Sequence, residues 1–150
     1  MIATVDKTLT VEAPAANLWA YVTDWKKHEE WIPLTRTETL GGEARAVGGR
    51  FRAWSGIGPI GFWDPMTVTR WEEQEDGSGF CAVVHTGRVV KGDAEITVTA
   101  LSGGRSTLRW VEHFQFGRVG SLGWRLGSRI VDRALHRALG RMVALVEARA

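Results

Sequence analysis

Two carboxylates each stand alone on an otherwise apolar strand face. In the segment 105–116, one parity holds Leu108, Trp110, Glu112, Phe114 and Phe116, and alternate residues of a strand share a face. A carboxylate on such a face either meets a basic partner or has its pKa raised by desolvation. Glu112 is therefore a candidate hydrogen-bond acceptor, proton donor or base. The alternative is a structural Glu that pairs with an Arg or accepts from backbone donors.

Asp64 repeats this arrangement, because it shares a parity with Phe62, Met66 and Val68. Pro65 follows it, which also suits a bulge or a strand edge, where the carboxylate would only accept backbone N–H groups. If both acids enter a cavity, Arg52, Arg88 and His85 are the available counter-charges. Strand parity does not decide which face these three occupy.

His85 lies late in a strand, in Val84-His85-Thr86-Gly87, and an imidazole titrates near neutral pH. It is the third candidate catalytic residue after Glu112 and Asp64, although a hydrogen-bonded wall residue is the commoner role for a lone strand His. His113 has the opposite parity to Glu112, which favours a surface role.

The chain has eight Trp and one Tyr. Trp19, Trp25 and Trp31 fall in short helical segments and are expected to anchor them to a sheet. The other five rings are placed where some could line a cavity, although core packing is the default for each: Trp54, Trp63, Trp71, Trp110 and Trp124. So many large rings favour a ligand with a flat or extended apolar surface.

These side chains must be held by one α+β domain of residues 1–150, a length typical of a single core. Alternation predicts a first strand over 2–11, and Pro14 then suits the start of a helix to Val22. A second short helix from Asp24 runs through Trp31. Glycine-rich turns separate six more strands, whose short connections favour an antiparallel meander: 36–40, 49–55, 62–73, 79–86, 92–101 and 105–116.

A long helix of about 29 residues is predicted after Gly117. Its predicted inner face holds Ile130, Val131, Ala134, Leu135, Ala138, Leu139, Met142, Leu145 and Val146, and the opposite face holds Arg125, Arg129, Arg133, Arg137 and Arg141. Gly120, Gly123 and Gly127 either leave volume for a ligand beside Leu122, Trp124 and Leu126, or mark a frayed first turn. Residues 56–61, Gly-Ile-Gly-Pro-Ile-Gly, are interpreted as a mobile loop at a cavity mouth.

Four segments resemble the START-like, or SRPBCC, helix-grip superfamily, in particular bacterial proteins of the polyketide cyclase/dehydratase type. They are Val11-Glu12-Ala13-Pro14 with Leu18-Trp19, Thr23-Asp24-Trp25 with Trp31-Ile32-Pro33, Asp64 to Thr69, and Trp110-Val111-Glu112 before the terminal helix. The resemblance implies a curved seven-stranded antiparallel sheet that grips the long helix around an elongated apolar cavity. Members bind hydrophobic small molecules there, and a minority act on them chemically.

The leading hypothesis is therefore a domain that binds an aromatic or lipid-like molecule between the sheet and the terminal helix. The expected ligand-binding residues are Trp54, Asp64, Met66, His85, Trp110, Glu112, Phe114, Leu122, Leu126 and Ile130. The first alternative is a cyclase/dehydratase enzyme that uses the cavity carboxylates as acid and base. The second is an interaction module whose Arg face meets an acidic partner at Arg125, Arg129 and Arg133.

Charge and composition narrow the remaining choices. Residues 118–150 hold seven basic and two acidic side chains, but the net charge of +2 is far below the density typical of DNA binding. No metal or redox cofactor is expected. The single Cys cannot by itself form a Cys-based zinc cage. A cytoplasmic location without a membrane span is expected, since no leader or long apolar run occurs. Homo-oligomerisation stays open.

Overall fold

The computed structural model describes residues 1–150, apart from the side chain of Val119. Seven antiparallel strands form one sheet in the order β1-β7-β6-β5-β4-β3-β2. The strands are β1 (Ile2–Val11), β2 (Thr35–Thr39), β3 (Arg50–Ile57), β4 (Ile60–Glu73), β5 (Gly79–His85), β6 (Gly92–Ala100) and β7 (Ser106–Gln115). The helices are α1 (Ala15–Val22), the 3-10 helix η1 (Trp25–Lys27), α2 (His28–Trp31) and α3 (Arg118–Ala148).

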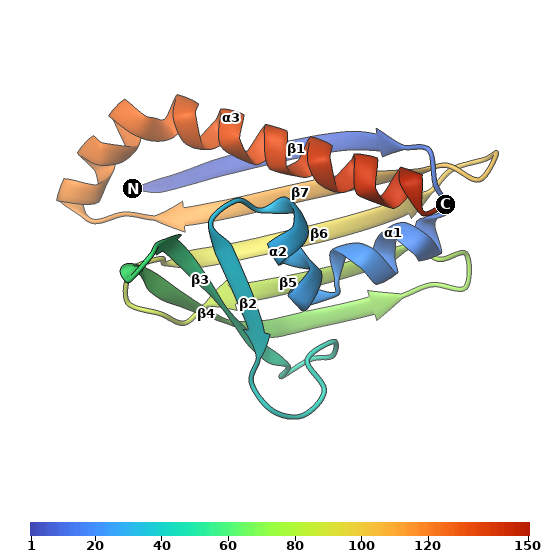
Figure 1. Ribbon diagram of the computed structural model, residues 1–150, viewed down its shortest axis with the longest axis horizontal. Coiled ribbons are helices and arrows are strands. Elements are labelled where there is room, and N and C mark those ends of the chain that lie inside the picture. Colours follow the sequence, from blue (N-terminus) through green and yellow to red (C-terminus); the bar gives the residue numbers. More distant parts are fainter.

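These elements confirm the predicted helix-grip architecture, in which the meander from β2 to β7 is closed by the first strand. β1 pairs with β7 over ten residues, from Ile2 opposite Gln115 to Val11 opposite Ser106. The short helices and α3 lie over the same face of the curved sheet (Figure 1). One face of the sheet is therefore enclosed, as a two-layer domain requires.

The core lies between α1, η1, α2 and the sheet. The indole ring of Trp25 stacks on Phe51 of β3 with ring centroids 4.2 Å apart, and its N–H donates to the carbonyl of Ala44 at 2.8 Å. Trp31 meets Trp110 of β7 edge to face at 5.6 Å. The predicted anchoring role of Trp19, Trp25 and Trp31 agrees with their burial.

Among the described residues, the fully buried side chains of the long helix lie in its C-terminal half. Leu139, Met142 and Val146 are buried, and α3 is tied to β1 by an ion pair of 2.7 Å between Lys7 and Asp132. Ile130 was expected on the same inner face, but 71% of it is exposed. The prediction for Ile130 was wrong because the buried stripe follows 139, 142 and 146, and a 3.6-residue period places residue 130 on the outer side.

Residues 56–61 are not a loop. β3 continues to Ile57 and β4 begins at Ile60, so that only Gly58 and Pro59 form the turn. Gly56 pairs with Gly61, and a Cβ on Gly56 would lie 2.3 Å from the carbonyl oxygen of Ile60. Glycine is therefore needed there for close approach of the two strands.

Among the described residues, no helix is both long enough and apolar enough to span a membrane.

Because the two halves of α3 differ in burial, Leu→Ala substitutions in them should lower the free energy of unfolding by different amounts. Leu139→Ala should lower the free energy of unfolding by about 2–5 kcal/mol, because Leu139 is fully buried. Leu126→Ala should change it by less than about 0.5 kcal/mol, since 79% of Leu126 is exposed. Urea denaturation of both variants measures the difference, and equal losses would contradict this division.

Candidate functional site

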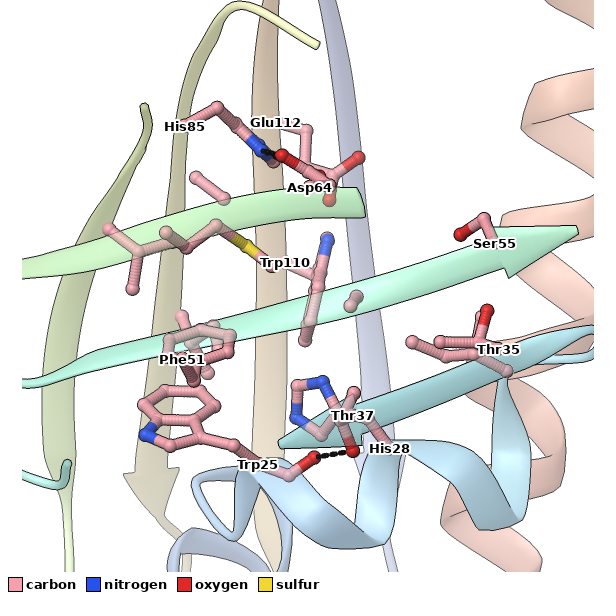
Figure 2. Close-up of a pocket in the computed structure, with 16 residues that line it drawn as sticks. Trp25, His28, Thr35, Thr37, Phe51, Ser55, Asp64, His85, Trp110 and Glu112 are labelled. Atoms are coloured by element: carbon pink, nitrogen blue, oxygen red, sulfur yellow. Dashed lines mark hydrogen bonds and ion pairs between the residues drawn. The ribbon is translucent and has the colours of Figure 1, made fainter. Parts of the chain in front are cut away.

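A cavity of about 150 Å³ lies between the inner face of the sheet and the segment formed by η1 and α2. Figure 2 shows its walls, which come from β2 through β7 and from these two short helices. The lining residues are Trp25, His28, Ile32, Thr35, Thr37, Phe51, Ala53, Ser55, Asp64, Met66, Val83, His85, Ala94, Ile96, Trp110 and Glu112. None belongs to α3.

Asp64, His85 and Glu112 meet at one end of this cavity (Figure 2). They come from three strands, β4, β5 and β7. Met66 pairs with His85 in the register of β4 and β5, and Glu112 pairs with Ala94 of β6. Because inward residues alternate, these registers bring both predicted carboxylates and the predicted His to one place. We call the three side chains the acid–His cluster.

The imidazole of His85 is oriented by Asp64. Its Nδ1 lies 2.9 Å from Oδ2 and 3.0 Å from Oδ1 of Asp64, so that Nδ1–H donates to the carboxylate. Nε2 is buried and has no hydrogen-bond partner among the described residues. Asp64 therefore holds Nδ1 of the ring, and Nε2 is left without a partner, able to form a hydrogen bond with a molecule in the cavity.

Electrostatics favour protonation of His85 despite its burial. Burial alone would lower the pKa of the imidazole, but the hydrogen bond and negative charge of Asp64, with the charges of Glu112 and Asp93, outweigh burial and raise the pKa above its ordinary value. His85 can then accept a proton from a ligand or a neighbouring acid near neutral pH.

The surroundings of Glu112 favour its protonated form. Burial raises the pKa of Glu112, and the negative charge of Asp64 adds to this, whereas His85 and the indole N–H of Trp110 act in the opposite direction. A carboxyl group of this kind can donate a hydrogen bond or a proton. The final strand was expected to provide this side chain, and the structure places it in the cavity.

Trp110 adds a second unused donor. Its Nε1 is directed toward Asp64 and Glu112 (Figure 2) and lies near enough to Glu112 to oppose the rise of its pKa, but it is buried without completing a hydrogen bond to any of the described residues. A buried N–H that makes no hydrogen bond costs about 1–3 kcal/mol. A ligand oxygen at this end of the cavity would remove that cost.

The opposite end of the cavity is aromatic and contains a residue that the sequence analysis missed. His28 is buried, and its Nε2–H donates a hydrogen bond of 2.8 Å to the carbonyl oxygen of Val22. Burial lowers the pKa of His28 to about 4, so that the ring is neutral at pH 7. The rings of Trp25, Trp31 and Trp110 surround it. No spacing in the sequence distinguishes this wall His from an ordinary helix residue.

Five of the ten expected ligand-binding residues line the cavity: Asp64, Met66, His85, Trp110 and Glu112. Trp54 lies on the other face of β3, where it meets Trp63 with ring centroids 5.5 Å apart. Phe114 packs against Trp124 at 5.4 Å, outside the cavity. Leu122, Leu126 and Ile130 are exposed on α3. The structure does not bring these five to the acid–His cluster.

The other polar residues singled out by the sequence lie elsewhere. Arg52 pairs with Glu38, and Arg88 is exposed. Nδ1–H of His113 donates to Oδ2 of Asp93 at 3.0 Å on the outer face. The expected surface position of His113 is confirmed. Among the described residues, no group of three or more His, Cys, Asp or Glu side chains is arranged to hold a metal ion.

The acid–His cluster predicts a reversal of the His85 pKa when Asp64 loses its charge. In Asp64→Asn, burial should dominate and lower the pKa of His85 below its ordinary value, whereas the wild-type pKa lies above it. A pH titration of the imidazole NMR signals measures both values, with Asp6→Asn on the outer face as a control. An unchanged His85 pKa in Asp64→Asn would contradict the arrangement.

Three solved structures share this fold over nearly their whole length. An aromatase/cyclase, ZhuI, from a Streptomyces species has a TM-score of 0.73 at 18% identity, covering 99% of this chain and 96% of its own. A norcoclaurine synthase point mutant from Thalictrum flavum, in complex with a transition-state analogue, has a TM-score of 0.68 at 12% sequence identity. The match covers 100% of this chain and 98% of the synthase chain. A START superfamily protein from Mycobacterium smegmatis has a TM-score of 0.64 at 16% sequence identity. The match covers 97% of this chain and 95% of that protein's chain.

No functionally curated protein matches the sequence. A family model, described as polyketide cyclase / dehydrase and lipid transport, matches residues 3–147. The chain therefore belongs to the polyketide cyclase / dehydrase and lipid transport family.

Proposed function

We propose that the cavity binds a mainly apolar molecule of about one ring, whose carbonyl or hydroxyl oxygen lies at the acid–His cluster. The observation that carries this proposal is a mainly apolar cavity in which the buried polar atoms without partners, among the described residues that line it, lie at the acid–His cluster. Nε2 of His85 and Nε1 of Trp110 are buried without partners among the described residues. Glu112, with its raised pKa, completes that end.

The volume limits the size of the ligand. A cavity of about 150 Å³ has the size of an engineered protein cavity that admits benzene. The stacked rings of Trp25 and Phe51 provide a flat wall. A monocyclic compound therefore fits this cavity, and a longer molecule would extend out of it.

Energy magnitudes show why the polar end decides selectivity. Burial of a ring comparable to a Phe side chain contributes roughly 1.5–3 kcal/mol. This is less than the ~4 kcal/mol that corresponds to a millimolar dissociation constant. Hydrogen bonds to a ligand oxygen must provide the remainder, and they distinguish oxygen-bearing ligands from hydrocarbons.

Acid–base chemistry of the cyclase or dehydrase type is the second candidate, and the Asp64–His85 hydrogen bond favours it. With Nδ1–H held by Asp64, Nε2 of neutral His85 can remove the α-proton of a β-hydroxy ketone. The electron pair of the broken C–H bond forms the C=C bond. The C–O bond breaks as Glu112 gives its proton to the departing hydroxyl, which leaves as water. His85 is then protonated and Glu112 ionised, and one proton transfer through solvent restores both.

We propose separately that an acidic partner, meaning any anionic surface, contacts α3 at Arg125, Arg129 and Arg133. The exposure of these three side chains on α3 supports it.

The binding proposal predicts that the N–H of Trp110 recognises oxygen. Wild-type protein should bind phenol more tightly than toluene by about 10-fold, and Trp110→Phe should remove most of this preference. Trp31→Phe is the matched control, because Trp31 also has an unpartnered buried N–H but does not line the cavity. NMR chemical-shift titrations of the wild type and both variants with phenol and with toluene measure all six affinities. Equal affinities of the wild type for phenol and toluene would overturn the proposal.

The catalytic candidate predicts a separate effect at Glu112. Glu112→Gln keeps the shape of the side chain but lacks the transferable proton, so dehydration of a phenyl-substituted β-hydroxy ketone should slow by about 100-fold or more. Its toluene affinity should stay unchanged. Enone absorbance measures turnover. If the wild type binds this ketone without accelerating water loss above buffer, the catalytic candidate fails and binding alone stands.

A further inference from the structure

One end of the molecule is both apolar and basic. Figure 1 shows the β3–β4 turn, the β5–β6 loop and the N-terminal half of α3 at the same end of the long axis, on the left of the view. The β6–β7 turn lies at the other end. We call the segments 57–63, 86–92 and 116–131 the basic–apolar end.

Large apolar side chains project from all three segments. Ile57 and Ile60 flank the β3–β4 turn with 70% and 81% of their surface exposed, and Val89 is exposed in the β5–β6 loop. Leu122 and Leu126 are exposed on α3. Scattered exposed apolar residues are ordinary, but their concentration on the tips of three segments at one end marks an interaction surface.

The three segments of the basic–apolar end are positively charged, and the aspartates that directly follow the second and third of them, Asp93 and Asp132, each lie beside a basic side chain, His113 and Lys7. The three segments contain no Asp or Glu, and they contain five basic residues, all exposed: Arg88, Lys91, Arg118, Arg125 and Arg129. None of the five pairs with a carboxylate among the residues that the structure describes. A second copy of the same end would be repelled, so the surface fits an anionic partner.

We infer that the basic–apolar end docks on an anionic lipid membrane. Lys and Arg side chains are attracted to the phosphates of such a surface, and neighbouring apolar side chains enter the boundary between headgroups and acyl chains. Separate projecting tips suit a lipid surface, which needs no complementary shape. A folded protein partner would instead need a continuous, closely packed patch.

A hollow of about 380 Å³ at the same end favours lipid over an acidic protein. It lies under α3, where Phe116 and Trp124 approach each other at 5.2 Å, and its other walls include Val89 and Val90. Gly123 and Gly127 face open space, since a Cβ added to either would meet nothing within 4 Å. An acyl chain fits such apolar walls, whereas an acid-rich protein surface offers no apolar group to fill them. This inference does not depend on the ligand of the inner cavity.

Vesicle co-sedimentation tests the inference with the full chain. The protein should bind phosphatidylcholine vesicles that contain phosphatidylglycerol, bind pure phosphatidylcholine vesicles weakly, and dissociate at high salt. The double variant Arg125→Glu with Arg129→Glu should lose about 10-fold or more in affinity. Arg105→Glu, which changes an exposed arginine in the β6–β7 turn, should bind like the wild type.

The apolar component separates lipid docking from simple charge attraction. Ile60→Ser with Leu126→Ser should reduce vesicle binding by about 10-fold or more, while the matched exposed substitution Val47→Ser should not. Soluble glycerophosphoglycerol should not compete. Binding that is unaffected by the Ile60 and Leu126 changes, or that is matched by a soluble acidic polypeptide, would overturn the inference.

Discussion

Asp64 and His85 must form a hydrogen bond with each other, because the apolar walls around them exclude the water that would otherwise solvate a carboxylate and an imidazole. Their hydrogen bond, with Nδ1 2.9 Å from Oδ2, fixes the orientation of the ring and leaves Nε2 facing the cavity. The negative charge of Asp64 raises the pKa of His85 against the effect of burial and adds to the effect of burial on Glu112, so the pKa values of both side chains are raised and both are shifted toward their protonated forms. The polar end of the cavity depends on this one pair.

The sheet positions the pair by register, and the short helices enclose it. β4, β5 and β7 each contribute one inward polar side chain, while Trp25 from η1 and His28 from α2 close the opposite wall. The long helix has two separate roles along its length. Its C-terminal half completes the core through Leu139 and Met142, and its N-terminal half presents arginines and exposed leucines to the surroundings. Stability and surface recognition can therefore change independently.

Local alternation was sufficient to predict much of this arrangement. A period of two residues placed Glu112 and Asp64 inward and His113 outward, because each strand is half buried. It could not show that the cavity lies against η1 and α2, since this depends on packing between distant segments. His28 and Phe51 were therefore missed. Ile130 was assigned to the inner face of α3, although the 3.6-residue period places it opposite the buried residues 139, 142 and 146. The turn at Gly58 and Pro59 was mistaken for a loop because glycines that permit close strand approach also occur in loops.

The location of the ligand is the central claim, and intermolecular NOEs from bound phenol measure it most directly. The ring protons of phenol should give NOEs to the methyl groups of Met66, Ala94 and Ile96, which line the cavity beside the acid–His cluster. They should give none to Leu122 or Leu126 of α3, which are exposed and do not line the cavity. NOEs confined to α3, with none to the three cavity methyl groups, would contradict the account.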